Sequence, residues 1–450
     1  MADRRARRIA FTTIGCRLNQ FETDALRGKA AAAAWEVVPF EAQADVYVIN
    51  TCTITAQADA DSRRLARQAV RRNPAALVAV TGCYAQGAPE EVASIPGVDL
   101  VLGTGEKAGL LGHLEAAAKN GGARVLVGAA GALREIDGGE YGPGIDPDRT
   151  RAFLKVQDGC NYRCSFCIVP SVRGANRSLS EDTILAELLR LHAVGFPEVV
   201  LTGIHLGTYG RDLPARTSLA GLCRRIAALP DAPRIRLSSL DPHEVGPELI
   251  GLLAGSRRFC RHLHLPLQSG DETILRRMRR GHTAAQFRGL VERLVAAVPG
   301  IAITADVIVG FPGEDDRAFR ATAALLESLP LAGLHVFSYS RRPGTDAATF
   351  AGQVPPATIA QRNRELRALS ARKAEDFRRA AVGQRLEVVV LHRDGPGGLR
   401  EGLSDNYLPV WFPGDEALKG HLAEVRARQV TGRGLLAELA PPTTPHATRA

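Results

Sequence analysis

The stretch FLKVQDGCNYRCSFC, residues 153–167, decides the fold of the central part of the chain. Its first six residues form a run typical of a buried strand, and Cys160, Cys164 and Cys167 follow in a C-x3-C-x2-C arrangement. Three thiolates on one short loop can reach three irons of a cubane cluster. The fourth iron is then free to chelate the amino and carboxylate groups of S-adenosylmethionine and to pass an electron to its sulfonium.

Two other kinds of site must be weighed against this interpretation. A zinc site needs four ligands, commonly at two-residue spacings, and no fourth Cys or His lies close to the motif in sequence. Buried structural thiols would not require three cysteines on one loop directly after a strand. The motif therefore indicates a four-iron cluster with one open iron.

An alternation of apolar runs and helical stretches surrounds the motif from about residue 150 to 350. Helix-forming segments such as 181–195 and 284–298 separate the apolar runs. The candidate strands are 153–158, 198–203, 234–240, 262–267, 303–311 and 333–340. Six such units predict an open, partial βα barrel whose active edge is formed by the C-terminal ends of the strands.

The N-terminal part of the chain also alternates apolar runs with helical stretches. Its strand-like runs, rich in Val, Ile and Thr, are 9–15, 45–51 and 76–82. Good helix formers occupy 24–35 and 58–72 between them. This pattern predicts an α/β domain with a doubly wound parallel sheet.

Cys16, Cys52 and Cys83 each follow directly on one of these three strands. In a parallel sheet all strand ends lie on the same edge, where ligands bind, and neighbouring strands are about 4.8 Å apart. The three thiols can therefore share a second cluster, again with one open iron. Packing of single buried cysteines is the alternative, and we assign that role to Cys223 and Cys260, which have no partner spacing.

The C-terminal part begins with a strongly basic helix, 357–383, and ends in short strand-like runs. The runs 385–392, 407–412 and 421–428 predict a small β-barrel. The Gly- and Pro-containing stretch 136–148 is expected to be a linker. The predicted domains are 1–140, 150–380 and 381–440, followed by a disordered tail, 441–450.

Composition limits the function classes. The chain has 450 residues, with 57 Lys and Arg against 48 Asp and Glu, a formal charge of +9 that favours a polyanionic partner. The basic start is not followed by an apolar signal region, and no apolar run is long enough for a membrane span. Clustered cysteines without these signals predict a cytoplasmic protein in a reducing environment.

The cysteine loop and two later motifs resemble the radical S-adenosylmethionine superfamily. LTGIHLGTYG (201–210) stands where that superfamily has a Gly-containing segment that binds the methionine amino group. VIVGFPGE (307–314) is similar to its later strand-end motif. The resemblance implies that Gly203 and Gly310 border the S-adenosylmethionine site.

Both cysteine trios together resemble the methylthiotransferase family, which combines an N-terminal three-cysteine domain, a radical barrel and a C-terminal TRAM domain that binds RNA. The motifs that carry this resemblance are GCRLNQFETDAL (15–26), INTCTIT (49–55), TGCYAQ (81–86) and HLPLQSGDETILRRMRRGHT (264–283). Residues 15–23, 153–178 and 401–412 are most similar to the MtaB-type enzymes.

The resemblance implies transfer of a methylthio group to C2 of N6-threonylcarbamoyladenosine, next to the anticodon of tRNA. It implies two 4Fe-4S clusters and S-adenosylmethionine as cofactors. The cluster of Cys16, Cys52 and Cys83 would hold the sulfur, which one S-adenosylmethionine methylates. A second S-adenosylmethionine, cleaved at the cluster of Cys160, Cys164 and Cys167, would give the radical that removes hydrogen from the substrate.

The expected partners are the tRNA anticodon stem-loop and an electron donor of the reductase or flavodoxin type, with the source of the sulfur left open. Arginines that could contact phosphate are Arg276, Arg277, Arg279 and Arg280, and seven cations of the basic helix: Arg362, Arg364, Arg367, Arg372, Lys373, Arg378 and Arg379. Against this expectation, the segment 381–440 is close to neutral.

Three alternatives stay open at this point. Two are other substrates of the family, N6-isopentenyladenosine in tRNA and an aspartate of a ribosomal protein. The third is a non-catalytic iron–sulfur protein that binds RNA as a redox sensor. A sensing cluster would normally be fully ligated, whereas the loop of Cys160 leaves one iron open.

Overall fold

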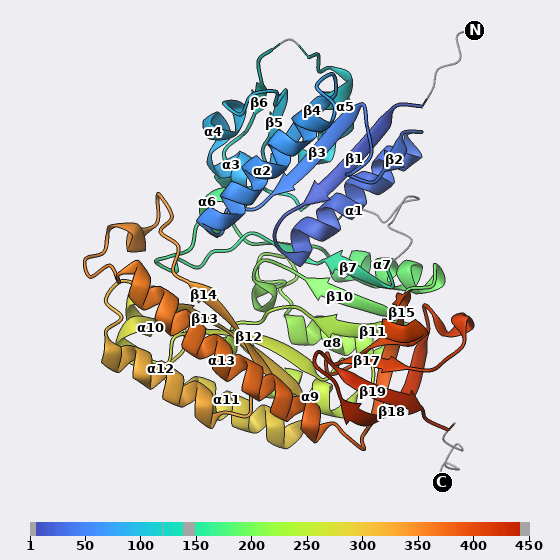
Figure 1. Ribbon diagram of the computed structural model, residues 1–450, viewed down its shortest axis with the longest axis vertical. Helices are drawn as coiled ribbons and strands as arrows, with labels where there is room; N and C mark the ends of the chain where they lie inside the picture. Colours follow the sequence, from blue (N-terminus) through green and yellow to red (C-terminus); the bar gives the residue numbers. More distant parts are fainter. Residues whose placement is uncertain (1–5, 120, 137, 139–148, 442–450) are drawn as a thin grey trace.

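The computed structural model describes residues 6–119, 121–136, 138 and 149–441. Figure 1 shows an N-terminal sheet (blue) above a partial barrel (green to orange), with a C-terminal barrel (red) beside the partial barrel at the right of the view. Most of the expected linker, 136–148, and of the expected tail, 441–450, lies outside the described residues.

The N-terminal sheet has six parallel strands in the order β2-β1-β3-β4-β5-β6. The strands are β1 (Arg8–Thr13), β2 (Glu36–Val38), β3 (Val46–Thr51), β4 (Leu77–Gly82), β5 (Leu100–Leu102) and β6 (Arg124–Leu126). The helices are α1 (Arg17–Ala32), α2 (Ala56–Arg72), α3 (Cys83–Gly87), α4 (Pro89–Ala93) and α5 (Leu110–Glu115). Residues of α1 and α5 pack on one face and residues of α2, α3 and α4 on the other, so the doubly wound sheet is confirmed.

The partial barrel consists of two parallel three-stranded sheets, β7-β10-β11 and β12-β13-β14. An isolated bridge between Ile235 and Phe259 joins β11 to the segment before β12. The strands are β7 (Arg151–Lys155), β10 (Glu198–Thr202), β11 (Arg234–Leu237), β12 (His262–Gln268), β13 (Ala302–Val309) and β14 (Gly333–Ser338). All six expected strands are present, and the prediction of an open βα barrel is confirmed.

Helices cover the outside of the partial barrel, and all but α10 (Glu272–Met278) share one apolar core with residues of its strands. They are α7 (Glu181–Ala193), α8 (Leu219–Ala228), α9 (Pro247–Gly255), α10 (Glu272–Met278), α11 (Ala284–Ala297) and α12 (Asp316–Ser328). The loop after β7 contains a two-residue pair, β8 (Gln157–Asp158) with β9 (Arg177–Ser178), and the short helix α6 (Val169–Arg173).

The basic helix α13 (Pro356–Ala380) packs along β14 and leads into a closed barrel in the order β15-β16-β17-β19-β18. The strands are β15 (Arg385–Asp394), β16 (Arg400–Ser404), β17 (Pro409–Phe412), β18 (Leu422–Val430) and β19 (Leu435–Leu439). The expected small barrel is confirmed, with β16 and β19 as strands that sequence patterns missed. None of the described helices has the length and apolar character needed to cross a membrane.

A buried carboxylate joins the C-terminal barrel to the amino end of the partial barrel. Glu198, the first residue of β10, accepts hydrogen bonds from Arg234 (2.6 Å) and Arg236 (2.8 Å) of β11. Arg236 also donates to the backbone carbonyls of Ser404 (3.0 Å), the last residue of β16, and of Asp405 (2.9 Å), which follows it. Burial opposes ionisation of Glu198, but Arg236 and Arg234 hold its pKa well below the usual range.

We expect Glu198→Gln to lower the free energy of unfolding by about 3–5 kcal/mol at neutral pH, because it leaves buried guanidinium groups without their counter-charge. The Glu198 pKa is lowered in the folded state, so its stabilising contribution is complete above the ordinary Glu pKa of about 4.3 and disappears as the pH falls. The difference in the free energy of unfolding between the variant and the wild type should therefore become smaller below about pH 4. Urea unfolding at several pH values measures it.

Glu327→Gln is the matched control, since Glu327 is exposed and paired with the exposed Arg372. This substitution should cost less than about 1 kcal/mol. Equal effects of the two substitutions would contradict the role assigned to Glu198.

Candidate functional site

Three neighbouring strands carry the N-terminal cysteines. Cys16 precedes α1 just after β1, Cys52 directly follows β3, and Cys83 follows β4 as the first residue of α3. Because β1, β3 and β4 are adjacent in the sheet, the three residues lie at one edge, as the strand pattern predicted. Glycine at position 15 lets the backbone before Cys16 pass close to Cys52. Its φ is +114°, and a side-chain carbon there would come within 3.2 Å of the Cys52 sulfur.

Burial differs among these thiols. Cys52 and Cys83 are buried, whereas Cys16 is exposed to solvent. Burial, reinforced by the neighbouring Cys83, raises the pKa of Cys52 to about 12. A thiol in this environment is poorly ionised unless a cation or a metal compensates its charge.

The cation beside this trio is Arg173, at the end of α6. Its side chain is fully buried, and its guanidinium donates to the Cys83 sulfur (3.2 Å) and to Glu22 of α1 (3.2 Å). Burial opposes the charge of Arg173, but Cys83 and Glu22 raise its pKa well above the usual range. Since α6 belongs to the same loop as Cys160, one side chain connects the two cysteine groups.

Glu22 completes this buried network. It is paired with Lys107, and the ammonium of Lys155 lies 3.6 Å from its carboxylate. Burial raises the pKa of Glu22, but the charges of Arg173 and Lys107 outweigh burial. The pKa of Glu22 is therefore well below the usual range. Sequence analysis missed Arg173 and Glu22; the only signal was an arginine in the short apolar segment that follows Cys167.

The second trio lies between β8 and α6, at the carboxyl end of the partial barrel. The Cys160 sulfur is 3.3 Å from Nδ1 of His205, and the Cys164 sulfur accepts a hydrogen bond from Arg280 (3.4 Å). Burial raises the pKa of Cys167 to about 12. Burial lowers the pKa of His205, but hydrogen bonds to Cys160 and Glu244 outweigh it and raise the pKa to about 9.

These thiols open onto a cavity of about 160 Å³. Its walls come from the cysteine loop and from the carboxyl ends of β10, β11 and β12. The lining residues are Cys160, Tyr162, Cys164, Phe166, Cys167, Val169, Ile204, His205, Ser239, Asp241, Pro266, Gln268 and Arg280. A small polar ligand bound here would contact both the thiols and the strand ends.

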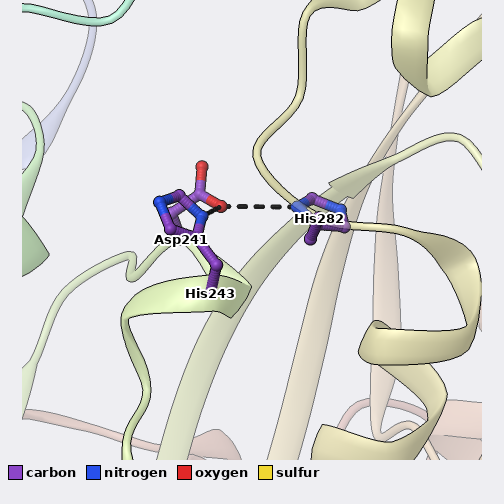
Figure 2. A group of neighbouring side chains, drawn as sticks. All are labelled: Asp241, His243 and His282. Atoms are coloured by element: carbon purple, nitrogen blue, oxygen red, sulfur yellow. Dashed lines mark hydrogen bonds and ion pairs between the residues drawn. The ribbon is translucent and has the colours of Figure 1, made fainter.

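Asp241 is the charged centre of the cavity wall. Figure 2 shows it between His243 and His282, whose Nδ1 atoms lie 2.8 Å and 3.4 Å from one carboxylate oxygen. Arg280 pairs with the other oxygen. Burial opposes ionisation, but hydrogen bonding to His243 and His282 lowers the Asp241 pKa. Although these donors are close enough for a metal ion, the guanidinium already supplies the counter-charge.

A second group of donors lies on the strands of the other half of the barrel. His264 of β12, Asp306 of β13 and His335 of β14 place one donor atom each within 4.8 Å of one another. Sequence analysis did not single out any of these residues, because their spacing along the chain gives no signal.

The two glycines named from sequence lie at strand ends. Gly203 follows β10, next to the cavity residue Ile204, and a side-chain carbon there would be 2.7 Å from Oε1 of Gln157. Gly310 follows β13 with φ +77° and donates its N–H to Glu314 (2.7 Å). A side-chain carbon at Gly310 would meet Ile359 of α13 at 2.3 Å. Gly310 therefore requires glycine, whereas the atom nearest to Gly203 is the end of a flexible side chain.

Several arginines expected to face phosphate are engaged within the protein. Arg280 belongs to the cavity, and Arg279 is paired with Asp346. On α13, the buried Arg362 donates to Glu314 (2.8 Å) and Asp316 (2.7 Å). The buried Arg280 and Arg362 are therefore committed to contacts within the protein, whereas Arg279 forms an exposed pair.

Comparison with known proteins covers both cysteine groups. Residues 154–326 match the radical SAM superfamily, and residues 8–103 match the Uncharacterized protein family UPF0004. The threonylcarbamoyladenosine tRNA methylthiotransferase MtaB of Bacillus subtilis is 38% identical over 93% of this chain and 93% of its own length. The protein of that name from Aquifex aeolicus is 39% identical over 90% of this chain and 96% of its own length.

A solved structure shows a similar fold at low identity. The radical S-adenosylmethionine methyltransferase TsrM from Kitasatospora setae, with cobalamin and a [4Fe-4S] cluster bound, superimposes with a TM-score of 0.52. The match covers 76% of this chain and 77% of that chain at 18% identity.

We expect the metal-free protein to be alkylated by iodoacetamide at Cys52 and Cys167 at a rate that rises about tenfold per pH unit from about pH 8 to about pH 10, because only the thiolate reacts. Both pKa values, about 12, lie above this range. Peptide mass spectrometry after timed quenching measures each site. A rate that levels off below about pH 9 would contradict the raised pKa values.

Proposed function

The chain belongs to the radical S-adenosylmethionine methylthiotransferase family, in its MtaB group, and we propose that it transfers a methylthio group to C2 of N6-threonylcarbamoyladenosine next to the anticodon of tRNA. The observation that carries the proposal is the presence of two three-thiol groups at facing strand ends, connected by Arg173. A radical methyltransferase with one cluster would need only the second group.

The donor sets fit the cofactors that the family implies. Cys160, Cys164 and Cys167 would hold one 4Fe-4S cluster, and Cys16, Cys52 and Cys83 would hold the other. When bound, the clusters and S-adenosylmethionine supply one-electron cleavage of a C–H bond and the methylated sulfur that replaces the hydrogen. Gly203 and Gly310 would border the S-adenosylmethionine site.

The chain's own residues position and neutralise these groups. Arg173 and Arg280 place one guanidinium beside each cysteine group, which offsets the charge of thiolates held away from water. His205 is fixed by Glu244 (2.8 Å) so that Nδ1 faces Cys160. Cys52 and Cys83 are buried, so the sheet edge shields this part of the N-terminal group from water.

The assignment of the two cysteine groups to two clusters gives each domain its own role. Residues 1–140 would supply the sulfur, 150–380 would generate the radical, and 381–440 would bind the anticodon stem-loop as a TRAM-type barrel together with α13. The electron donor would be of the reductase or flavodoxin type, and the enzyme would act in the cytoplasm.

Mass spectrometry of tRNA nucleosides tests the substrate. Deletion of the gene should abolish methylthio-threonylcarbamoyladenosine, and the wild-type gene should restore it. Loss of the methylthio form of isopentenyladenosine instead, or of a modified ribosomal aspartate, would overturn the proposal in favour of the corresponding relative. A reconstituted protein that forms no 5′-deoxyadenosine from S-adenosylmethionine with a reductant would indicate a redox sensor.

We expect replacement of Cys16, Cys52 and Cys83 together by alanine to halve the iron content from about eight to about four atoms per chain. The variant should still cleave S-adenosylmethionine, because Cys160, Cys164 and Cys167 are intact. It should transfer no methylthio group, because it lacks the cluster that would hold the sulfur. Iron analysis and 5′-deoxyadenosine assays after anaerobic reconstitution measure this. The control is Cys223→Ala, whose thiol lies in the apolar core. Unchanged iron in the triple variant would refute the N-terminal cluster.

Arg173→Lys tests the connection between the two thiol groups. Lysine keeps the charge but cannot donate to the Cys83 sulfur and to Glu22 with the same planar fork. Because hydrogen bonds to cluster sulfurs help to set the reduction potential, we expect the N-terminal cluster to become harder to reduce. The expected shift is tens of millivolts at most, and the other cluster should be unchanged. Redox titration followed by electron paramagnetic resonance measures the N-terminal cluster in a Cys160/Cys164/Cys167→Ala background and the other cluster in a Cys16/Cys52/Cys83→Ala background.

A further inference from the structure

The concave face of the partial barrel carries the polar side chains of His264, Asp306 and His335 next to the exposed ring of Phe337. His335 and Phe337 alternate on β14 with Leu334 and Val336, which belong to the core shared with the outer helices. His335 and Phe337 therefore face the inside of the barrel. Both side chains are exposed, Phe337 to 45%, so this edge strand presents a phenyl ring on the concave face.

This face continues the cavity beside the radical cluster. In the register of the parallel strands, Asp306 of β13 is paired with Pro266 on one side and with His335 on the other. Pro266 lines the cavity of Cys160. Phe337 is paired with Ile308, two residues nearer the carboxyl end than His335, or roughly 7 Å along the strand. The phenyl ring therefore lies toward the mouth of the barrel.

The same strand leads to the other cysteine group. The hydroxyl of Ser340, just beyond β14, accepts a hydrogen bond from the backbone N–H of Ala56 (3.0 Å). Arg342 donates to Thr53, the residue after Cys52 (2.8 Å), and to Asp59 (2.6 Å). A ligand on Phe337 would thus lie along the path from the radical cavity to the Cys52 loop.

The chemistry of the polar group is defined by its hydrogen bonds. Asp306 lies 2.8 Å from Nε2 of His264 and 3.4 Å from Nδ1 of His335. The two imidazole rings stack at 4.7 Å, and Thr304 holds Nδ1 of His264 at 2.8 Å. Within the described residues, Nε2 of His335 has no hydrogen-bond partner. With Nδ1–H donated to Asp306, this nitrogen is an acceptor for an N–H or O–H group.

On the basis of the proposed function, we propose that Phe337 stacks on the adenine of the substrate nucleoside and that His335, held by Asp306 and His264, binds its polar N6 substituent. A threonylcarbamoyl group offers urea N–H groups and a hydroxyl to Nε2 of His335. An isopentenyl group offers none, and its burial would leave the imidazole unsatisfied. A site built to hydrogen-bond a substrate group strongly rejects an analogue that lacks it. The His335 group therefore determines specificity between the two nucleosides.

Binding of anticodon stem-loops to the reconstituted holoenzyme tests this assignment. Stem-loops with threonylcarbamoyladenosine, isopentenyladenosine or unmodified adenosine are compared by fluorescence anisotropy. His335→Leu should weaken binding of the threonylcarbamoyl stem-loop roughly 5- to 150-fold and leave the isopentenyl one nearly unchanged, because it leaves a polar group of the covered threonylcarbamoyl substituent without its acceptor. Phe337→Ala should weaken all three by a similar factor, also roughly 5- to 150-fold, because stacking is indifferent to the substituent.

The matched control is His192→Leu, on the exposed outer side of α7, which should leave all three affinities unchanged. A His335→Leu variant that keeps the wild-type ratio of affinities would overturn the assignment. Stoichiometric zinc that the wild type retains and this variant loses would also overturn it, because the group would then be a metal site.

Turnover of the wild type, measured in parallel, separates this assignment from the proposed function. A wild type that methylthiolates only the isopentenyl stem-loop overturns the proposed function and the assignment with it. A wild type that methylthiolates the threonylcarbamoyl stem-loop, combined with an unaltered affinity ratio in His335→Leu, overturns the assignment alone.

Discussion

The buried guanidinium of Arg173 is the constraint on which the arrangement of the two cysteine groups depends. A charge without contact to water is tolerated only if it is paired and fully hydrogen-bonded, and here the partners are Glu22 and Cys83 of the N-terminal domain. If the N-terminal sheet moved away from the cysteine loop, this cation would lose Glu22 and Cys83 and keep only Asp158 of its own loop as a charged partner at 3.3 Å. A second buried pair, Arg342 with Asp59, constrains the N-terminal domain in the same way beyond the end of β14.

These contacts make two parallel sheets meet at their carboxyl ends. Each sheet alone would offer a ligand site at that edge, but neither would bring two groups of three thiols to one reaction space. The outer helices and the apolar cores stabilise the two halves, and Phe21 of α1 belongs to the core of the partial barrel. The buried pairs of Glu22 with Arg173 and of Asp59 with Arg342 add polar contacts between the halves. Apolar packing and buried ion pairs thus together determine how the domains face each other.

Sequence patterns predicted what depends on local periodicity. The strands before Cys16, Cys52 and Cys83 were recognisable, and their adjacency followed from the parallel sheet. Strands β2, β5 and β6 have three residues each, too short to show a period. Arg173 could not be predicted, because its partners lie 90 and 151 residues away. Arg280 was grouped with phosphate-binding arginines, although the fold places it beside Cys164.

Tyr407 shows how the third domain is fixed to the other two. It was expected to begin a strand, but its φ of +68° places it in a turn before β17, a conformation that costs a non-glycine residue roughly 1–2 kcal/mol. The ring stacks on His262 at 4.6 Å and lies under the Arg236 guanidinium, and its hydroxyl accepts a hydrogen bond from Arg17 (2.9 Å). Arg17 directly follows Cys16. These contacts offset the strain, and they fix the C-terminal barrel relative to the thiols, so that RNA held by this barrel would reach the reaction space in one defined orientation.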